Sequence, residues 1–158
     1  MIELIRYDLR KKEEWDDFCG LFSLYLSEVC GEEEYQEEID DLHNDELNEE
    51  MIDQTLREHD PYFIMRIAEN EERIGLISYS YREEGNRGYI NNFYVCAERR
   101  SSGLGSAVLR MAENHLRSLG AEYIELVPVK TAESFYIRNG YEFSRTSSAG
   151  EQVFRKLI

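Results

Sequence analysis

The chain has 158 residues, of which 42% are apolar, and it carries a formal net charge of -15 at neutral pH. This length suits one substantial core, and we expect a single domain over residues 1–158. The acidity argues against nucleic acid as a partner, and no apolar run approaches the roughly 18 residues of a membrane span. The three cysteines stand in no CxxC pair and the first residues hold no apolar signal region, so we expect a reduced, cytoplasmic protein.

The first part of the chain predicts a strand followed by two helical stretches. Residues 2–9 alternate in polarity, which is typical of a strand. Apolar positions at helical spacing predict an amphipathic helix over residues 15–31. A second helical stretch follows over residues 35–61, with a break near Asn44 and with Pro61 as its stop.

The rest of the chain predicts a sheet whose strands are joined by turns and two further helices. Runs rich in β-branched and aromatic residues predict strands over residues 62–69, 73–82, 89–96, 123–129, 141–146 and 151–158. Helical patterns cover residues 104–119, with Gly120 as C-cap, and a shorter stretch at 131–140. A strand–helix–strand crossover joins parallel strands, so we expect one mixed α/β sheet, mostly antiparallel, with one parallel pair in its centre.

The acidity is concentrated in one segment. Residues 13–53 hold 17 Asp and Glu and no Lys or Arg. Of the 33 acidic residues, the remaining 16 stand with all 18 basic residues, so the rest of the chain is nearly neutral. Such a charge run is ordinarily a solvated helix face that keeps a protein soluble. The alternative is a negative wall that attracts a cationic ligand.

A short glycine-rich turn, RRSSGLGSAVL at residues 99–109, precedes the helix at 104–119. A helix N-terminus carries unpaired N–H groups and a partial positive charge, and glycine lets an anion approach the backbone. The turn therefore predicts a phosphate site, with a plain turn capped by Ser101 or Ser102 as the alternative. The P-loop and dinucleotide patterns do not fit, because the first needs a Lys and the second a glycine where Val108 stands.

Two motifs give a family resemblance. R-x-x-G-x-G spans Arg100 to Gly105, and A-x-x-F-Y-x-x-x-G-Y spans Ala132 to Tyr141. Together with the order of predicted elements, they make the chain similar to the GCN5-related N-acetyltransferase (GNAT) superfamily. The motif match covers residues 90–143, and the first half of the chain matches in pattern only.

The resemblance implies a sheet that splays open between the two parallel central strands, with acetyl-CoA in the wedge. The pantetheine arm is expected along the backbone of Phe93, Tyr94 and Val95. The diphosphate is expected on the turn, and Phe135 beside the cofactor. The turn residues so implied are Arg100, Ser101, Ser102, Gly103, Leu104, Gly105 and Ser106. No metal is implied, and His43, His59 and His115 show no ligand spacing.

The resemblance also implies that Tyr136 assists the departing CoA thiolate. A thiol has a pKa of about 8.5 and a tyrosine one of about 10, so a hydrogen bond to the thiolate is the safer role than full proton transfer. The strand position where many members carry a Glu is occupied here by Tyr89, Asn91 and Asn92. Glu125, on the next strand, is a candidate base, and a water chain is the alternative.

The sequence therefore predicts an acetyl-CoA-dependent N-acetyltransferase. Transfer is expected to be direct, to a primary amine of a cationic small molecule or a basic peptide. Two alternatives stay open: a non-catalytic module that senses acetyl-CoA or binds a cation, and an acetyltransferase for protein N-termini or lysines. A homodimer through the C-terminal hairpin fits the resemblance.

Overall fold

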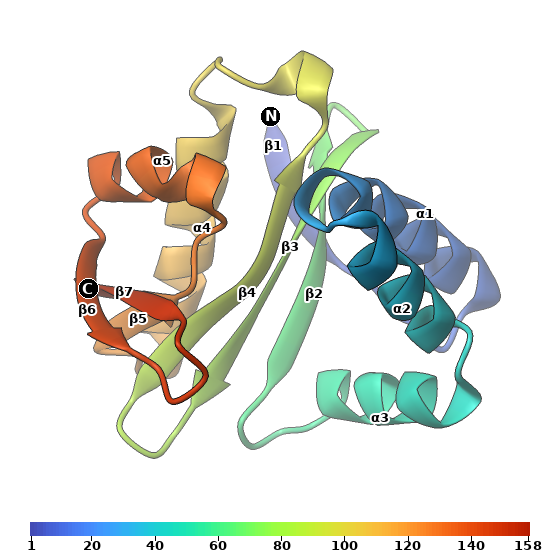
Figure 1. Ribbon diagram of the computed structural model, residues 1–158, viewed down its shortest axis with the longest axis horizontal. Helices are drawn as coiled ribbons and strands as arrows, with labels where there is room; N and C mark the ends of the chain where they lie inside the picture. The colour runs from blue at the N-terminus through green and yellow to red at the C-terminus, as the bar shows by residue number, and fades with distance from the viewer.

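The computed structural model describes residues 1–158 as one seven-stranded sheet with helices on both faces (Figure 1). The strands lie in the order β1-β2-β3-β4-β5-β7-β6. Their bounds are β1 Ile2–Arg6, β2 Tyr62–Glu69, β3 Glu72–Arg82, β4 Arg87–Val95, β5 Tyr123–Leu126, β6 Glu142–Thr146 and β7 Gln152–Leu157. All neighbouring strands are antiparallel except β4 and β5, which confirms the predicted mixed sheet.

The parallel pair is short, and this opens the sheet. Strands β4 and β5 are paired from Arg87, opposite Tyr123, to Ile90, opposite Leu126. Beyond Ile90, β4 continues to Val95 without a partner on its β5 side. The register of β4 against β3 shifts at the same point, so Asn91 forms a bulge. The predicted splay between the two central strands is therefore confirmed.

The helices agree with the predicted pattern, with one difference. They are α1 Lys12–Val29, α2 Glu32–Leu42, α3 Asp45–Thr55, α4 Leu104–Leu119 and α5 Glu133–Arg138, with 3-10 turns at Ala97–Arg99 and Lys130–Ala132. The predicted break near Asn44 is confirmed, because its side chain caps α3 by accepting a hydrogen bond from the Leu47 N–H at 3.2 Å. Helix α3 ends at Thr55, well before Pro61, so the proline is not its stop. None of the helices combines the length and the apolarity that crossing a bilayer requires.

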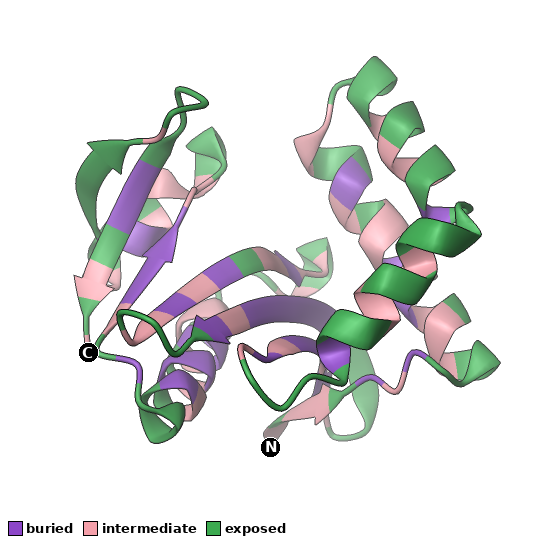
Figure 2. Cartoon of the chain, turned by 90° about the horizontal axis from the view of Figure 1, so that it is seen from below, coloured by how far each residue is buried: buried purple, intermediate pink, exposed green.

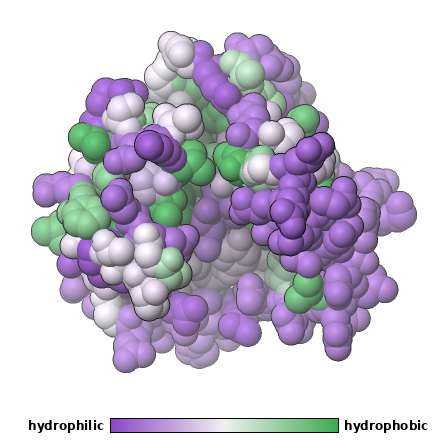
Figure 3. Space-filling view, viewed as in Figure 1, coloured by the Kyte–Doolittle hydropathy of each residue, from purple (hydrophilic) through white to green (hydrophobic).

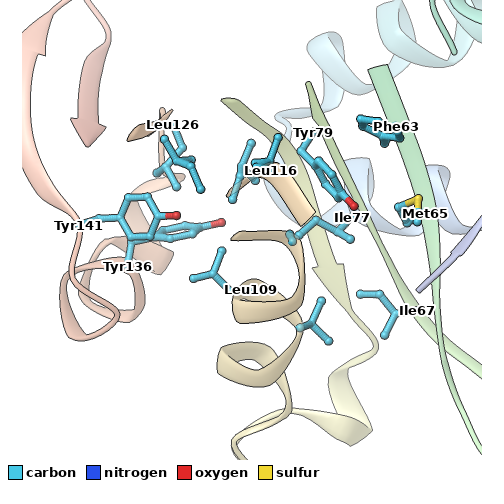
Figure 4. Close-up of a cluster of buried hydrophobic side chains, with 14 of the residues drawn as sticks. Phe63, Met65, Ile67, Ile77, Tyr79, Leu109, Leu116, Leu126, Tyr136 and Tyr141 are labelled. Atoms are coloured by element: carbon cyan, nitrogen blue, oxygen red, sulfur yellow. The ribbon is translucent and has the colours of Figure 1, made fainter. Parts of the chain in front are cut away.

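The two faces of the sheet carry cores of different size. Helices α4 and α5 cover one face with a cluster of 19 buried residues, part of which Figure 4 shows around Leu109 and Leu116 of α4. Helices α1 to α3 cover the other face, where the cluster has eight buried residues. In Figure 2 much of the centre of the sheet is buried, most of all in β2, β3 and β5, whereas α2 and α3 are largely exposed. The acidic segment therefore forms a thin outer layer on one face.

Candidate active site

A cleft of about 740 Å³ opens where β4 and β5 separate. The unpaired end of β4, the start of α4, the segment after β5, helix α5 and the last turns of α1 line it. Figure 3 shows a hollow on this face, between the hydrophilic α1–α3 side and the more mixed opposite side. Ten of the predicted site residues line the cleft: Phe93, Tyr94, Val95, Arg100, Ser101, Gly103, Gly105, Ser106, Phe135 and Tyr136.

The unpaired edge of β4 forms one wall of the cleft. Because β5 diverges after Leu126, the backbone of β4 from Asn91 to Val95 has no strand on this side. Such an edge offers N–H and C=O groups to an extended ligand in the manner of an added strand. One of these groups is engaged, since the Val95 carbonyl accepts a hydrogen bond from Arg100 Nε at 2.7 Å.

The glycine-rich turn is the second binding element. Ser101 and Gly103 both adopt left-handed backbone conformations, with φ of 65° and 79°. Gly103 is the N-cap of α4 and no side chain caps the helix, while Ser102 Oγ donates to the carbonyl of Arg99 at 3.2 Å. The first amides of α4 are therefore uncapped, as an anion site requires, and the capping-serine alternative does not apply.

Not every residue of the turn faces the cleft. Arg99 forms ion pairs with Glu69 and Glu72 of the β2–β3 hairpin. Ser102 and Leu104 line a separate hollow of about 440 Å³ on the other side of the turn. The predicted set of turn residues is thus divided between the two sides.

Gly105 serves a packing purpose that the motif alone does not reveal. A Cβ at this position would lie 3.2 Å from Cε1 of Phe135, tighter than ordinary van der Waals contact. The missing side chain lets Phe135 pack against the first turn of α4, and the Phe135 ring also meets Phe93 edge-on at 6.0 Å between centroids. Gly105 therefore closes one side of the cleft with an aromatic wall.

Tyr136 projects from α5 into this aromatic cluster and is 7% exposed. Its ring meets Phe135 at 5.1 Å and Tyr141 at 5.7 Å, both in edge-to-face geometry, and Figure 4 shows the two tyrosines against each other. Burial raises the pKa of the Tyr136 hydroxyl, and the nearby Tyr25 adds to the shift. The hydroxyl of this cleft-lining residue therefore stays protonated at neutral pH and is available as a hydrogen-bond donor.

A buried charged network supports this cluster from behind. The Tyr141 hydroxyl donates to Glu113 Oε2 at 2.8 Å. Lys156 Nζ donates to both carboxylate oxygens of Glu113, at 3.0 and 3.1 Å. The network links Tyr141, which follows α5, to Glu113 of α4 and Lys156 of β7. It therefore fixes the Tyr141 ring against which Tyr136 packs.

Glu125 is placed differently from the other predicted residues. Its side chain is only 7% exposed, and it forms ion pairs with Arg87 at 3.2 Å and with Arg145 at 3.4 Å. It does not line the cleft, although it pairs with Tyr89 one residue before the last β4–β5 pair. The Glu125 carboxylate is therefore part of a bridge between β4, β5 and β6.

Helix α1 supplies cleft residues that the sequence reasoning missed. Tyr25, Glu28 and Val29 line the cleft. Tyr25 meets Tyr94 edge-on at 6.2 Å, and burial raises its pKa to about 12. The helical pattern assigned this face to the core, and no signal in the sequence separates a core tyrosine from one at a cleft wall.

No group of three His, Cys, Asp or Glu side chains is arranged as metal ligands.

The comparisons with known proteins agree with this architecture. The sequence model of the acetyltransferase (GNAT) family matches residues 15–141. A search of curated protein sequences finds no match. Similar solved structures include a PaiA N-acetyltransferase from Thermoplasma acidophilum in complex with coenzyme A, with a TM-score of 0.78, 16% identity and coverage of 100% of this chain and 99% of that one.

Two further solved structures are similar to this chain over nearly its whole length. One is GCN5 from Tetrahymena, with a TM-score of 0.68, 14% identity and coverage of 100% and 96%. The other is an aminoglycoside 6′-acetyltransferase type Ii, with a TM-score of 0.69, 18% identity and coverage of 99% and 96%. At these identities the structures establish the fold. The family match extends over most of the chain, from α1 to the end of the second motif, and the chain belongs to the acetyltransferase (GNAT) family of acyltransferases.

Proposed function

We propose that this protein is an acetyl-CoA-dependent N-acetyltransferase that passes the acetyl group directly to a primary amine of a cationic small molecule or a basic peptide. The observation that carries the proposal is the cleft, which joins a free strand edge, an uncapped helix start and a buried tyrosine hydroxyl. These three features match the amides, the diphosphate and the thioester of acetyl-CoA. Bound acetyl-CoA would supply the acetyl group as an activated thioester.

The chain's own groups then have separate binding roles. The backbone of Phe93, Tyr94 and Val95 pairs with the amides of the pantetheine arm. The amides at the start of α4, together with the helix dipole, hold the diphosphate, and Phe135 excludes water on the far side. The diphosphate site comprises the turn residues Arg100, Ser101, Ser102, Gly103, Leu104, Gly105 and Ser106, with Ser102 and Leu104 contributing backbone from the outer side.

Tyr136 donates a hydrogen bond to the departing sulfur. Because its pKa is raised by burial, complete proton transfer to a thiolate is uphill, whereas a hydrogen bond to the developing charge lowers the barrier. The role of Glu125 as base stays a prediction, and its two arginine partners favour a bridging role instead. The remaining route for the amine proton is a water chain toward the acidic segment.

The acceptor assignment rests on charge. Residues 13–53, which form α1, α2 and most of α3, carry 17 acids without a Lys or Arg and stand on one side of the hollow. A negative wall raises the local concentration of a cation and its rate of encounter. The aminoglycoside 6′-acetyltransferases among the similar structures are named for substrates of this charge class.

The test is release of CoA thiol from acetyl-CoA with spermidine, an aminoglycoside, a lysine-rich peptide and neutral amines, each at low and high salt. We expect turnover with cations that falls as salt rises. Turnover with neutral amines alone would mean that the acidic segment is a solvated surface and does not attract the acceptor. Turnover with the peptide alone would favour a protein N-terminal or lysine acetyltransferase.

Binding of acetyl-CoA without turnover for any acceptor would favour the sensing module.

A homodimer is a separate proposal, which the exposed edge strand β6 supports. Sedimentation velocity at two protein concentrations tests it, and a concentration-independent monomer would exclude it. A cytoplasmic location stays a prediction.

A further inference from the structure

The side chain of Arg100 makes three contacts within the protein, with Glu28, Val95 and Tyr94. Its Nη2 donates to Glu28 Oε2 at 2.6 Å, and its Nε donates to the Val95 carbonyl at 2.7 Å. The guanidinium also lies over the Tyr94 ring, 5.4 Å from the centroid. Arg100 thus connects the glycine-rich turn to the end of β4 and to the last turn of α1.

Glu28 stands in an unfavourable place for a carboxylate. It lies in the last turn of α1, at the negative end of the helix dipole, and that turn contains no basic residue. Among the residues that line the cleft, it is the one acid. Arg100, which is 72 positions away in the sequence, supplies the positive charge that this turn lacks.

Resting on the proposed function, we infer that Glu28 competes with the cofactor's diphosphate for Arg100 and so lowers the affinity of the cleft for CoA. One guanidinium neutralises one unit of charge, so the carboxylate and the diphosphate compete for the same positive group. Arginine pairs with phosphate through parallel hydrogen bonds, which are stronger than a single contact to a half-exposed carboxylate. The diphosphate therefore draws the guanidinium from Glu28.

The same movement has a second effect on the cleft. The Val95 carbonyl that Arg100 engages belongs to the strand edge proposed for the pantetheine arm. When the guanidinium turns toward phosphate, this carbonyl is released for an amide of the ligand. Glu28 and the pantetheine site are thus linked through one side chain.

The experiment is calorimetric titration of CoA alone into the full chain at low salt. We expect Glu28→Gln to bind CoA about two- to fivefold more tightly, the range expected for one partly exposed ion pair. Glu37→Gln is the matched control, because it removes the same charge from an exposed position of α2 that has no ion pair. Its affinity should equal that of the wild type.

A cycle with Arg100→Gln separates competition from a general charge effect. Arg100→Gln alone should weaken binding, and adding Glu28→Gln to it should give no gain. Arg100→Lys replaces it if the melting temperature shows that the Gln variant is unfolded. Unchanged or weaker binding by Glu28→Gln, or an equal gain without Arg100, overturns the inference while CoA binding supports the proposed function. No CoA binding by the wild type overturns both.

Discussion

The two faces of the sheet differ in how firmly they hold what they contribute to the cleft. The α4–α5 face buries 19 residues and includes the charged network of Glu113. The hydrophobic cluster of the α1–α3 face has eight buried residues, and α2 and α3 each contain a single buried residue, Leu42 and Thr55. The difference teaches that the α4–α5 side of the cleft is held in place by dense packing, whereas the α1 side is backed by a smaller core and an exposed acidic layer.

The largest effect should come from breaking the network on the denser face. Lys156→Met leaves the Glu113 carboxylate, which is 4% exposed, without its cation. Removing one partner of a buried pair costs about 3 kcal/mol, so the unfolding free energy should fall by that amount. Urea denaturation measures it.

The opposite face provides the control. Glu37→Gln removes a charge from exposed α2 and should change the unfolding free energy by less than about 0.5 kcal/mol. The double variant Glu113→Gln with Lys156→Met should recover much of the loss, because no lone charge then remains buried and the amide oxygen can still accept from Tyr141. Equal effects of Lys156→Met and Glu37→Gln would contradict the contrast between the faces.

The next effect concerns chemistry at the junction of the two faces. Tyr136→Phe removes the hydroxyl but keeps the ring against Phe135 and Tyr141. Loss of a donor to developing charge costs about 100-fold in kcat, and the KM for acetyl-CoA should not change. Steady-state kinetics with an accepted amine measures both.

Tyr141→Phe is the matched variant for Tyr136→Phe. It removes the donor to Glu113 and should lower stability by about 1 kcal/mol while kcat is nearly kept. Unchanged turnover in Tyr136→Phe, with a true acceptor, would remove that hydroxyl from the mechanism.

The same contrast explains what the sequence could predict. Local signals mark the α4–α5 side of the cleft: the turn before α4 and the motif on α5 single out Arg100, Gly103 and Tyr136, which line one cleft in the structure. Periodicity predicted α1 as a core helix but could not reveal that Tyr25 and Glu28 line the cleft, because that depends on where β4 and β5 separate. Contacts distant in sequence, such as Glu28 with Arg100, leave no local pattern.

Glu125 shows the same limit, and its substitution should have a moderate effect. Strand position made it a candidate base, whereas its ion pairs with Arg87 and Arg145 are visible only in three dimensions. Glu125→Gln should lower the unfolding free energy by about 1 kcal/mol, because both arginines are partly exposed, and should leave kcat within about twofold. A kcat loss of about 100-fold, with the acidic limb of the pH profile removed, would instead establish it as the base.

The smallest effect should be a pH dependence confined to the denser face. His115 of α4 lies with its Nδ1 2.7 Å from the Tyr79 hydroxyl and with its ring 4.6 Å from that of Phe63. Burial lowers the pKa of His115, and the positive charge of Arg6 lowers it further. A lowered folded-state pKa means that the unfolded chain binds the proton more readily, so this stability is present above about pH 6.5 and is lost as the pH falls below it.

His115→Gln removes the titrating group, so its melting temperature should fall less steeply than that of the wild type between pH 7 and pH 5. The many carboxylates of the other face are common to both proteins, and their contribution cancels in the difference. Parallel profiles would mean that protonation of His115 does not weaken the larger core. A shallower profile for the variant would show that the more densely packed face also contains a site at which acid weakens it, because burial disfavours the charged imidazole.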